Sequence, residues 1–380
     1  MLPHAGRSVS EEWIGLTEDI NSARRRIGEI DEQIMKLVCE RIREAEKIGR
    51  MKRDRKVPVR DFTVEAQVIE RAERICEMNG IPGHIGREVS KSLIMASLSV
   101  QTSSDISVYE GQSRRILIVG GNGKMGRWYA HYFNTQGHEV VINDIERVPS
   151  PFKFEPDLLR AVSMADVVIL STPISVTAGI IRQLAEASCG ATVIDGCSLK
   201  SPLINEIRFG ISRGMRIASI HPMFGPGTRM LVDQNLIVCD CGDREAVETA
   251  VSLFRDTSLN ITVIDIARHD EIMGYALGAA HAINIVFFDM LSRSGIGAAE
   301  MDRFASTTLR RQISTAADVA RENPLLYYEI QNLNSHRDTV FSSLARSLEA
   351  VRKASFSSSA DDFIDIMNRG RLYFEEAQNV

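Results

Sequence analysis

Three glycines that follow a short apolar run are the residues whose spacing points most directly to chemistry. Gly121, Gly123 and Gly126 come after the apolar segment 116–119 with the spacing G-x-G-x-x-G. The first glycine permits a tight turn, the second lets the backbone approach a pyrophosphate, and the third lets a helix pack closely on the strand. Phosphates would then lie at the helix N-terminus, where backbone N–H groups favour negative charge. The other residues expected in this turn are Asn122, Lys124 and Met125.

A carboxylate follows the next predicted strand. The segment 139–144 ends at Asp144, about 20 residues after the turn, where an acid can bind the ribose hydroxyls of adenosine. Because a carboxylate there repels a 2′-phosphate, the sequence favours NAD over NADP. Glycine-rich turns can also serve packing alone, but the strand-helix-strand context favours a dinucleotide site. A later strand, 166–173, ends at Thr172 and Pro173, which we expect to line the same site.

His221 is the candidate base. It lies near the end of a strand expected at 216–222, in the segment IHPMFGPG, whose prolines and glycines indicate a shaped loop. Ligands of open α/β sheets bind at the carboxyl ends of the strands. Ser198 and Lys200 follow the earlier strand 191–196 in the same way, so we expect them to meet His221 at the rim of the sheet. An isolated histidine is more often structural, and the loop composition favours the functional interpretation.

Cations line a long N-terminal helix predicted at 17–53. Its apolar residues recur at helical spacing and no proline interrupts it. Arg41 and Lys52 project from nearly the same face, while Arg24 is rotated by roughly 100° from Arg41. Such a helix is longer than a small domain is wide, so its apolar face needs another chain. Taken alone, two cations on one face also fit a solvated surface.

The order of polar residues over 17–101 resembles the all-helical chorismate mutase family. This resemblance implies that Arg41 and Arg24 of the partner subunit bind the two carboxylates of chorismate, and that Ser97 assists them. The implied reaction is a pericyclic rearrangement. It needs no general base, but it needs a flexible dianion held in a compact conformation and donors at the oxygen where negative charge develops.

The same resemblance implies roles for four further residues. Lys52 and Gln101 would donate to the ether oxygen of chorismate, and Asp61 and Glu65 would hold the region of its ring hydroxyl. The sequence departs from the family at Val64, where many members carry an arginine. This departure concerns the strength of substrate binding.

The rest of the chain, from about residue 114, resembles the prephenate dehydrogenase family in four ordered segments, GNGKMG, CSLK, HPMFGP and HAIN. With the N-terminal segment it resembles the T-protein family, the bifunctional chorismate mutase–prephenate dehydrogenases of tyrosine synthesis. The resemblance implies NAD-dependent oxidation and decarboxylation of prephenate to 4-hydroxyphenylpyruvate. A neutral His221 would accept the hydroxyl proton as hydride leaves. Ser198 would orient His221 or the hydroxyl.

The substrate carboxylate is a second point of departure. The family places an arginine for the ring carboxylate shortly before an AsnPro or AspPro dipeptide, and that position here is Asp318. Arg310 and Arg311 lie upstream and are candidate replacements, and Arg310 matches another arginine common in the family. His281, in the segment HAIN, is a candidate for the substrate pocket, although a histidine at a helix interface is nearly as common.

Composition limits the other classes of function. The chain has 380 residues, of which 44% are hydrophobic and 25% are charged, as in soluble proteins of two or three domains. A net charge of −5 gives no general case for nucleic-acid binding. Six cysteines without a C-x-x-C pair indicate reduced thiols, a cytoplasmic location and no metal site. No segment approaches the ~18 uninterrupted apolar residues of a membrane span, and no signal-peptide pattern is present.

We therefore predict a multidomain fold. It has an all-α, chorismate-mutase-like domain at 1–105, an α/β Rossmann-type NAD-binding domain at 106–268, and an all-α dimerisation and substrate domain at 269–380. Residues 102–113 are the expected linker, and the pattern is helical from about Asp270. Both helical regions need a partner surface, so a homodimer is expected.

Two alternatives stay open at this stage. The dehydrogenase could act on arogenate, with an N-terminal module that binds a ligand or dimerises without catalysis. A β-hydroxyacid dehydrogenase is disfavoured because His221 in HPMFGP takes the place of a catalytic lysine on the C-terminal helices.

Overall fold

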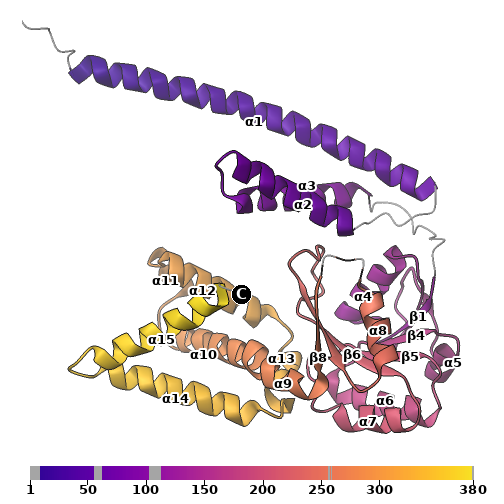
Figure 1. Ribbon diagram of the computed structural model, residues 1–380. Helices are drawn as coiled ribbons and strands as arrows, with labels where there is room; N and C mark the ends of the chain where they lie inside the picture. Colours follow the sequence, from indigo (N-terminus) through magenta and orange to yellow (C-terminus); the bar gives the residue numbers. More distant parts are fainter. Residues whose placement is uncertain (1–8, 55–61, 102–112, 256, 258, 379–380) are drawn as a thin grey trace, which may run out of the picture.

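The chain folds into an N-terminal group of helices, a central sheet covered by helices on both faces, and a C-terminal group of helices (Figure 1). The structure is a computed structural model and describes residues 9–54, 62–101, 113–255, 257 and 259–378.

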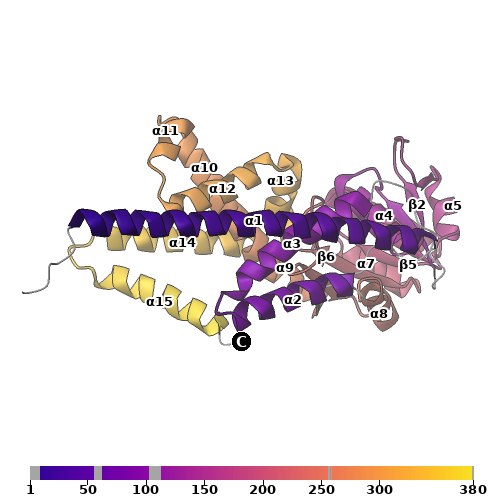
Figure 2. The same cartoon turned by 90° about the horizontal axis from the view of Figure 1, so that it is seen from above.

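Three helices form the N-terminal part: α1 (Val9–Asp54), α2 (Phe62–Met78) and α3 (Gly83–Gln101). Helix α1 has 46 residues and begins earlier than predicted, because no proline or glycine pair interrupts residues 9–16. Its C-terminal part lies along α3, whereas its N-terminal part extends past α2 and α3 (Figure 1). Viewed from above, α1 crosses most of the width of the molecule (Figure 2).

The central sheet has eight strands in the order β3-β2-β1-β4-β5-β6-β7-β8. All neighbouring pairs are parallel except β6 and β7. The strands are β1 (Arg115–Val119), β2 (Glu139–Asn143), β3 (Lys153–Phe154), β4 (Val167–Leu170), β5 (Thr192–Asp195), β6 (Ile217–Pro222), β7 (Asn235–Asp240) and β8 (Asn260–Asp265). Parallel pairing places the carboxyl ends of β1, β2, β4, β5 and β6 at one edge, which is where a doubly wound fold binds ligands.

Helices cover both faces of this sheet. One core lies under α4 (Lys124–Thr135) and α8 (Arg244–Ser252), and it includes Tyr129 and Phe133. The other lies under α5 (Leu158–Ser163), α6 (Ile174–Glu186) and α7 (Ile204–Ser212). Strands buried on both faces read as continuous apolar runs, as β4 does.

The C-terminal part is helical throughout its described residues, as the sequence predicts. Its elements are α9 (Ile266–Met273), one π-helical turn (Gly274–Ala279), α10 (Ala280–Ser292), α11 (Ala298–Arg303), α12 (Thr307–Arg321), α13 (Pro324–Leu333), α14 (Arg337–Ser355) and α15 (Asp361–Gln378). By length and composition alone, the continuous stretch Ile266–Ser292 could cross a membrane. The buried polar residues His269, Asp270 and Asn284 lie within it.

Candidate functional site

The glycine turn after β1 is shaped for close backbone approach. A Cβ atom on Gly126 would lie 2.1 Å from the carbonyl oxygen of Gly120, so α4 packs on the turn only because residue 126 is glycine. Gly120 has the left-handed φ of +79°. The glycine spacing predicted that Gly121 would form the tight turn. The backbone at Gly121 instead packs against Ile142, where a Cβ would come within 2.6 Å. Gly120 is therefore a turn residue that the spacing rule missed by one position.

The N-terminus of α4 faces this turn without a side-chain cap. Gly123 occupies the cap position in an extended conformation and supplies no capping hydrogen bond, so the first N–H groups of α4 are available to an anion. Lys124 is exposed and Met125 is half-buried at the start of the helix. These features fit the pyrophosphate of a dinucleotide.

Asp144 joins the turn to the end of β2. Its Oδ2 accepts a hydrogen bond of 2.8 Å from the backbone N–H of Asn122, and its Oδ1 accepts from Ile145. The carboxylate is thus fixed beside the turn at the position that suits a ribose. After the end of β4, the Oγ1 of Thr172 lies 2.8 Å from that of Thr177, and Pro173 is the N-cap residue of α6.

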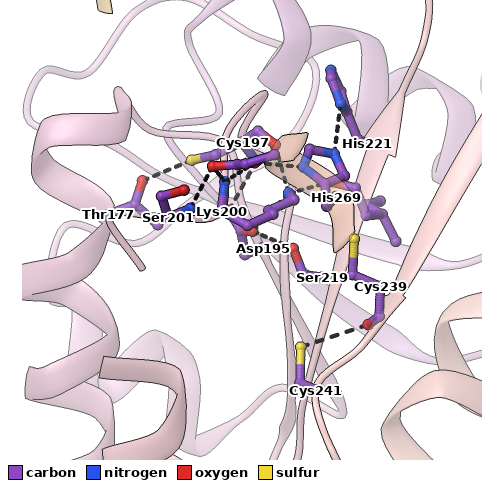
Figure 3. Close-up of polar contacts among 12 residues, drawn as sticks. Thr177, Asp195, Cys197, Lys200, Ser201, Ser219, His221, Cys239, Cys241 and His269 are labelled. Carbon is purple, nitrogen blue, oxygen red and sulfur yellow. Dashed lines mark hydrogen bonds and ion pairs between the residues drawn. The ribbon is translucent and has the colours of Figure 1, made fainter. Parts of the chain in front are cut away.

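His221 is the terminal member of a buried chain of hydrogen bonds. Its Nδ1 lies 3.0 Å from Nε2 of His269, and Nδ1 of His269 lies 2.6 Å from Oδ1 of Asp270 (Figure 3). All three side chains are almost completely buried. Because His221 is the next-to-last residue of β6 and the other two residues belong to α9, the chain of hydrogen bonds also joins the sheet to the C-terminal helices.

The charges around this chain set its protonation. Burial opposes ionisation of Asp270, but hydrogen bonds from His269 and from the Ser201 and Lys200 segment outweigh it and lower the pKa of Asp270 to about 2. Burial lowers the pKa of His269. Burial also lowers the pKa of His221 well below 6.5, and the charge of Lys200 adds to this effect.

These protonation states assign the tautomers. An ionised Asp270 accepts from Nδ1–H of His269, which leaves Nε2 of a neutral His269 as an acceptor. Nδ1–H of His221 therefore donates to His269, and Nε2 of His221 keeps its lone pair. The arrangement produces a neutral imidazole that can accept a proton at one defined atom.

Lys200 lies beneath this site and does not reach the rim that the sequence suggested for it. Its side chain is fully buried, with Nζ 2.9 Å from Oδ2 of Asp195 and 2.9 Å from the carbonyl oxygen of Ile220. Ser219 donates to the same Asp195 oxygen. Since Ile220 precedes His221, Lys200 supports the end of β6 from inside the sheet (Figure 3).

Ser198 is the other residue expected to meet His221 at the rim of the sheet. It is half-buried, and within the described residues it makes no hydrogen bond to His221. The partner of His221 is His269, which is 48 residues away in sequence and was not a candidate from sequence reasoning. The only local signal is the HisAsp pair at 269–270, near the start of the C-terminal helices.

The candidate substrate residues lie on the C-terminal helices. On α10, the ring of His281 stacks on Tyr327 with centroids 4.2 Å apart, and its buried Nδ1 has no hydrogen-bond partner among the residues that the structure describes. Arg310 is exposed on α12 and pairs with Asp302 at 3.6 Å, while Asp318 pairs with Arg321. Within the described residues neither His281 nor Arg310 contacts His221.

The N-terminal helices bring part of the second predicted site together. Nη1 of Arg41 on α1 donates to Oγ of Ser97 at 2.6 Å and to the carbonyl oxygen of Leu93 at 2.9 Å, both on α3. Burial lowers the pKa of Arg41. Glu65 is buried in the first turn of α2. Arg41, Ser97 and Glu65 thus lie on three packed helices.

Other predicted residues of this site are placed less fully. Arg24 is exposed on α1. Lys52 and Gln101 belong to α1 and α3, but their side chains lie outside the described residues, as does all of Asp61.

Three family models match successive parts of the chain. Residues 23–102 match the family described as chorismate mutase type II. Residues 143–263 match the nucleotide-binding domain of prephenate dehydrogenase, and residues 265–369 match its dimerisation domain. The chain belongs to the bifunctional chorismate mutase–prephenate dehydrogenase family.

Two curated relatives span different parts of the chain. The T-protein of Haemophilus influenzae is 23% identical over 364 residues, which cover 94% of this chain and 93% of that protein. A probable arogenate/prephenate dehydrogenase of Methanocaldococcus jannaschii is 26% identical over 270 residues, covering 68% of this chain and 60% of that protein. The T-protein alignment includes both the mutase segment and the dehydrogenase.

A solved structure shares the dehydrogenase fold. Prephenate dehydrogenase from Aquifex aeolicus, solved with hydroxyphenyl propionate and NAD⁺, superposes with a TM-score of 0.57 at 17% identity and covers 70% of this chain and 99% of that chain. The family model that residues 143–263 match is a nucleotide-binding domain, and the nucleotide bound in the Aquifex aeolicus structure is NAD⁺. The glycine turn precedes the matched residues 143–263, and its backbone geometry fits that cofactor independently.

Proposed function

We propose that this chain rearranges chorismate to prephenate in its mutase segment and then oxidises and decarboxylates prephenate to 4-hydroxyphenylpyruvate in its dehydrogenase, for tyrosine biosynthesis. The observation that carries the second step is the hydrogen-bonded chain from Asp270 through His269 to His221, at the sheet edge where the glycine turn opens.

His221 is the base of the oxidation. Its Nε2 accepts the proton of the substrate's ring hydroxyl, while the carbon that bears this hydroxyl loses its hydrogen as hydride. NAD⁺, when bound, supplies the hydride acceptor. The loss of CO₂ then restores aromaticity in the product. Because His269 and Asp270 hold Nδ1–H of His221, the lone pair is presented at Nε2 without rearrangement.

The cofactor-binding residues we propose surround the turn. They are Gly121, Asn122, Gly123, Lys124, Met125, Gly126, Asp144, Thr172 and Pro173. The uncapped α4 terminus supports their role toward the pyrophosphate, and the fixed carboxylate of Asp144 supports its role toward the ribose.

The substrate residues of the dehydrogenase are also proposals. Ser198 would contact the substrate hydroxyl, since His221 already has His269 as its partner. His281, with its unpartnered Nδ1, would line the substrate pocket. Arg310 would bind the ring carboxylate in place of the arginine that Asp318 replaces.

In the mutase, Arg41 and Arg24 of the partner subunit would bind the two carboxylates of chorismate. The contact of Arg41 with Ser97 supports a shared carboxylate site for these two residues. Lys52 and Gln101 would donate to the ether oxygen, and Asp61 and Glu65 would hold the ring hydroxyl region.

The working unit would be a homodimer in the cytoplasm, with no role for a nucleic acid or a membrane. The match of residues 265–369 to a dimerisation domain supports this proposal. It also offers an explanation for the exposed apolar side chains of Ile266–Ser292, such as Ile283, Val286 and Met290, as a surface for a second copy of the chain.

Product analysis of the full chain tests the proposal. Prephenate with NAD⁺ should give NADH and 4-hydroxyphenylpyruvate, and chorismate with NAD⁺ should give the same products. Arogenate should be oxidised more slowly, and NADP⁺ should replace NAD⁺ poorly. Faster oxidation of arogenate, or failure to consume chorismate, would contradict the assignment.

A further inference from the structure

The segment that follows His221 is held from outside the dehydrogenase by the mutase helices. Nη1 of Arg87, on α3, donates to both carboxylate oxygens of Asp233 at 2.6 Å. Lys91, one turn later on α3, pairs with the same carboxylate at 3.2 Å. Asp233 lies between β6 and β7, twelve residues after His221.

Arg87 is itself fixed within the mutase segment. Its Nε donates to Glu73 of α2 at 2.6 Å, so one guanidinium joins α2, α3 and the dehydrogenase loop. The hydrogen bonds of Asp233 and then of Glu73 raise the pKa of Arg87, while those of Arg87 and Lys91 lower the pKa of Asp233. A planar guanidinium shared between two carboxylates constrains direction as well as distance.

Apolar contacts accompany the charged ones. Val232 is buried in a small cluster with Ile69 of α2 and Ile94 of α3, against which Met230 packs. At the start of α2, Phe62 is buried in the main core of the dehydrogenase, with its ring centroid 6.0 Å from that of Tyr132. The two parts of the chain therefore share packed side chains as well as a linker.

The dehydrogenase holds the same segment from its other side. Nε1–H of Trp128 on α4 donates to the carbonyl oxygen of Thr228 at 2.9 Å, and the indole packs on Phe224 with centroids 5.1 Å apart. Leu231 is buried in the sheet core. Residues 223–233 thus lie between α4 of the dehydrogenase and α2–α3 of the mutase.

Asp233 takes a backbone conformation that needs support. Its φ is +63°, a left-handed value that is unfavourable for most residues and that, among non-glycine residues, Asp and Asn tolerate best. The ion pair with Arg87 and Lys91 forms at this residue.

We propose that the mutase helices α2 and α3 are a structural part of the dehydrogenase site, and that Arg87 and Lys91 act through Asp233 as positioning residues for the segment after His221. On α3, Leu93 and Ser97 accept hydrogen bonds from Arg41 of the mutase site. The neighbouring Ile94 packs in the same cluster as Val232 of the dehydrogenase, so α3 contacts both sites. This inference depends on the proposed dehydrogenase function.

The test is Asp233→Asn, which keeps the volume and the tolerance of a left-handed backbone but removes the charge. We expect kcat/KM for supplied prephenate to fall about threefold to tenfold, since water screens a partly exposed pair. Chorismate turnover should stay within about twofold, because the mutase residues are not altered. Glu206→Gln is the matched control: it weakens another two-bonded arginine pair, with Arg182, within the dehydrogenase alone.

Fluorescence provides a readout that is independent of activity. The chain has two tryptophans, so Trp13→Phe leaves Trp128, which contacts the segment directly. In that background Asp233→Asn should shift the Trp128 emission, and Glu206→Gln should not. If Asp233→Asn fails to fold, Arg87→Lys keeps the charge but loses the two-bonded geometry and should give the same shift.

Unchanged kcat/KM together with unchanged Trp128 emission would overturn the proposal. Inactivity of the parent enzyme toward prephenate would instead contradict the proposed function, and the emission shift would still report whether the mutase helices hold the segment.

Discussion

The imidazole of His221 has one nitrogen engaged by His269 and the other available to a substrate. A neutral histidine ring has one donor and one acceptor nitrogen, and their order decides which atom can take a proton. His269 donates from Nδ1 to the ionised Asp270, so its Nε2 is an acceptor. His221 therefore carries its proton on Nδ1 and its lone pair on Nε2. We therefore propose that His269 positions His221 and that His221 accepts the proton.

Substitution of His269 tests this positioning role. His269→Phe keeps the ring volume but removes the acceptor for Nδ1–H of His221, so kcat should fall by about tenfold to a hundredfold, a part of the range of general-base effects. His269→Gln can place an oxygen near the former Nε2 and should recover much of the loss. Stopped-flow NADH formation measures both variants. Equal activity of the Phe variant and the parent would refute the positioning role.

The pH dependence of the oxidation follows from the lowered pKa of His221. Burial is the main cause of this lowered pKa, the charge of Lys200 acts in the same direction, and the charge of Asp270 opposes them. The neutral ring is the active form, so kcat should persist as pH falls through about 6.5 and decline only at lower pH. A kcat profile on folded enzyme, verified by circular dichroism, measures this limb. A midpoint above 6.5 would contradict the assigned environment.

Sequence reasoning reached His221 but not its partner, and the reason is physical. A histidine at the end of a strand, among prolines and glycines, has a local signature. His269 acts through a contact between β6 and α9, which no local pattern encodes. Lys200 shows the opposite error, because its position after a strand suggested the rim while its pairing with Asp195 places it inside.

At the scale of elements, the join between β1 and α4 decides whether a dinucleotide can bind. The spacing of glycines predicted this join, and the structure moves the left-handed turn residue to Gly120. Spacing alone does not show which of two adjacent glycines forms the turn and which packs against the sheet. That difference depends on Ile142 of the neighbouring strand. The helical spacing of apolar residues over a long segment predicted α1. The strand β3 has only two residues, which are too few to show a periodic pattern.

Gly126→Ala tests the packing of this join. The added Cβ would lie 2.1 Å from the oxygen of Gly120, so α4 must shift, which should destabilise the protein by about 1–3 kcal/mol and weaken NAD binding at least about tenfold. Gly179→Ala in α6 is the control, because its Cβ meets nothing within 4 Å and should stabilise the helix by about 0.5–1 kcal/mol. Thermal unfolding and NAD⁺ titration measure both. Equal NAD⁺ affinity of the two variants would argue against the turn as the pyrophosphate site.

In the molecule as a whole, α1 presents an apolar surface that the described residues of this chain leave exposed. Ile27, Ile34 and Leu37 are 57%, 48% and 64% exposed. The N-terminal part of α1 stands away from the C-terminal helices in Figure 1, although the two overlap in Figure 2. Burial of such side chains against a second copy of α1 would stabilise a dimer by about 1.5–3 kcal/mol for each fully covered residue.

Sedimentation velocity of the parent should therefore show a dimer. Ile34→Glu should weaken the α1 contact and lower mutase activity, since the mutase site that we propose includes Arg24 of the partner subunit. Dehydrogenase activity on supplied prephenate should be retained. Lys36→Glu, at an exposed polar position on the same helix, should affect neither activity. A monomeric parent with full mutase activity would exclude the shared site.

In the enzyme that we propose, one chain carries two sites, and His221 is the base of the second. His221→Asn keeps a hydrogen-bonding side chain but cannot take up the proton. When the variant receives chorismate and NAD⁺, prephenate should accumulate at the parent's mutase rate, while NADH formation falls by at least ~10²-fold and NAD⁺ affinity is unchanged. NADH formation near the parent rate, or a parallel loss of both activities in the folded variant, would contradict the account.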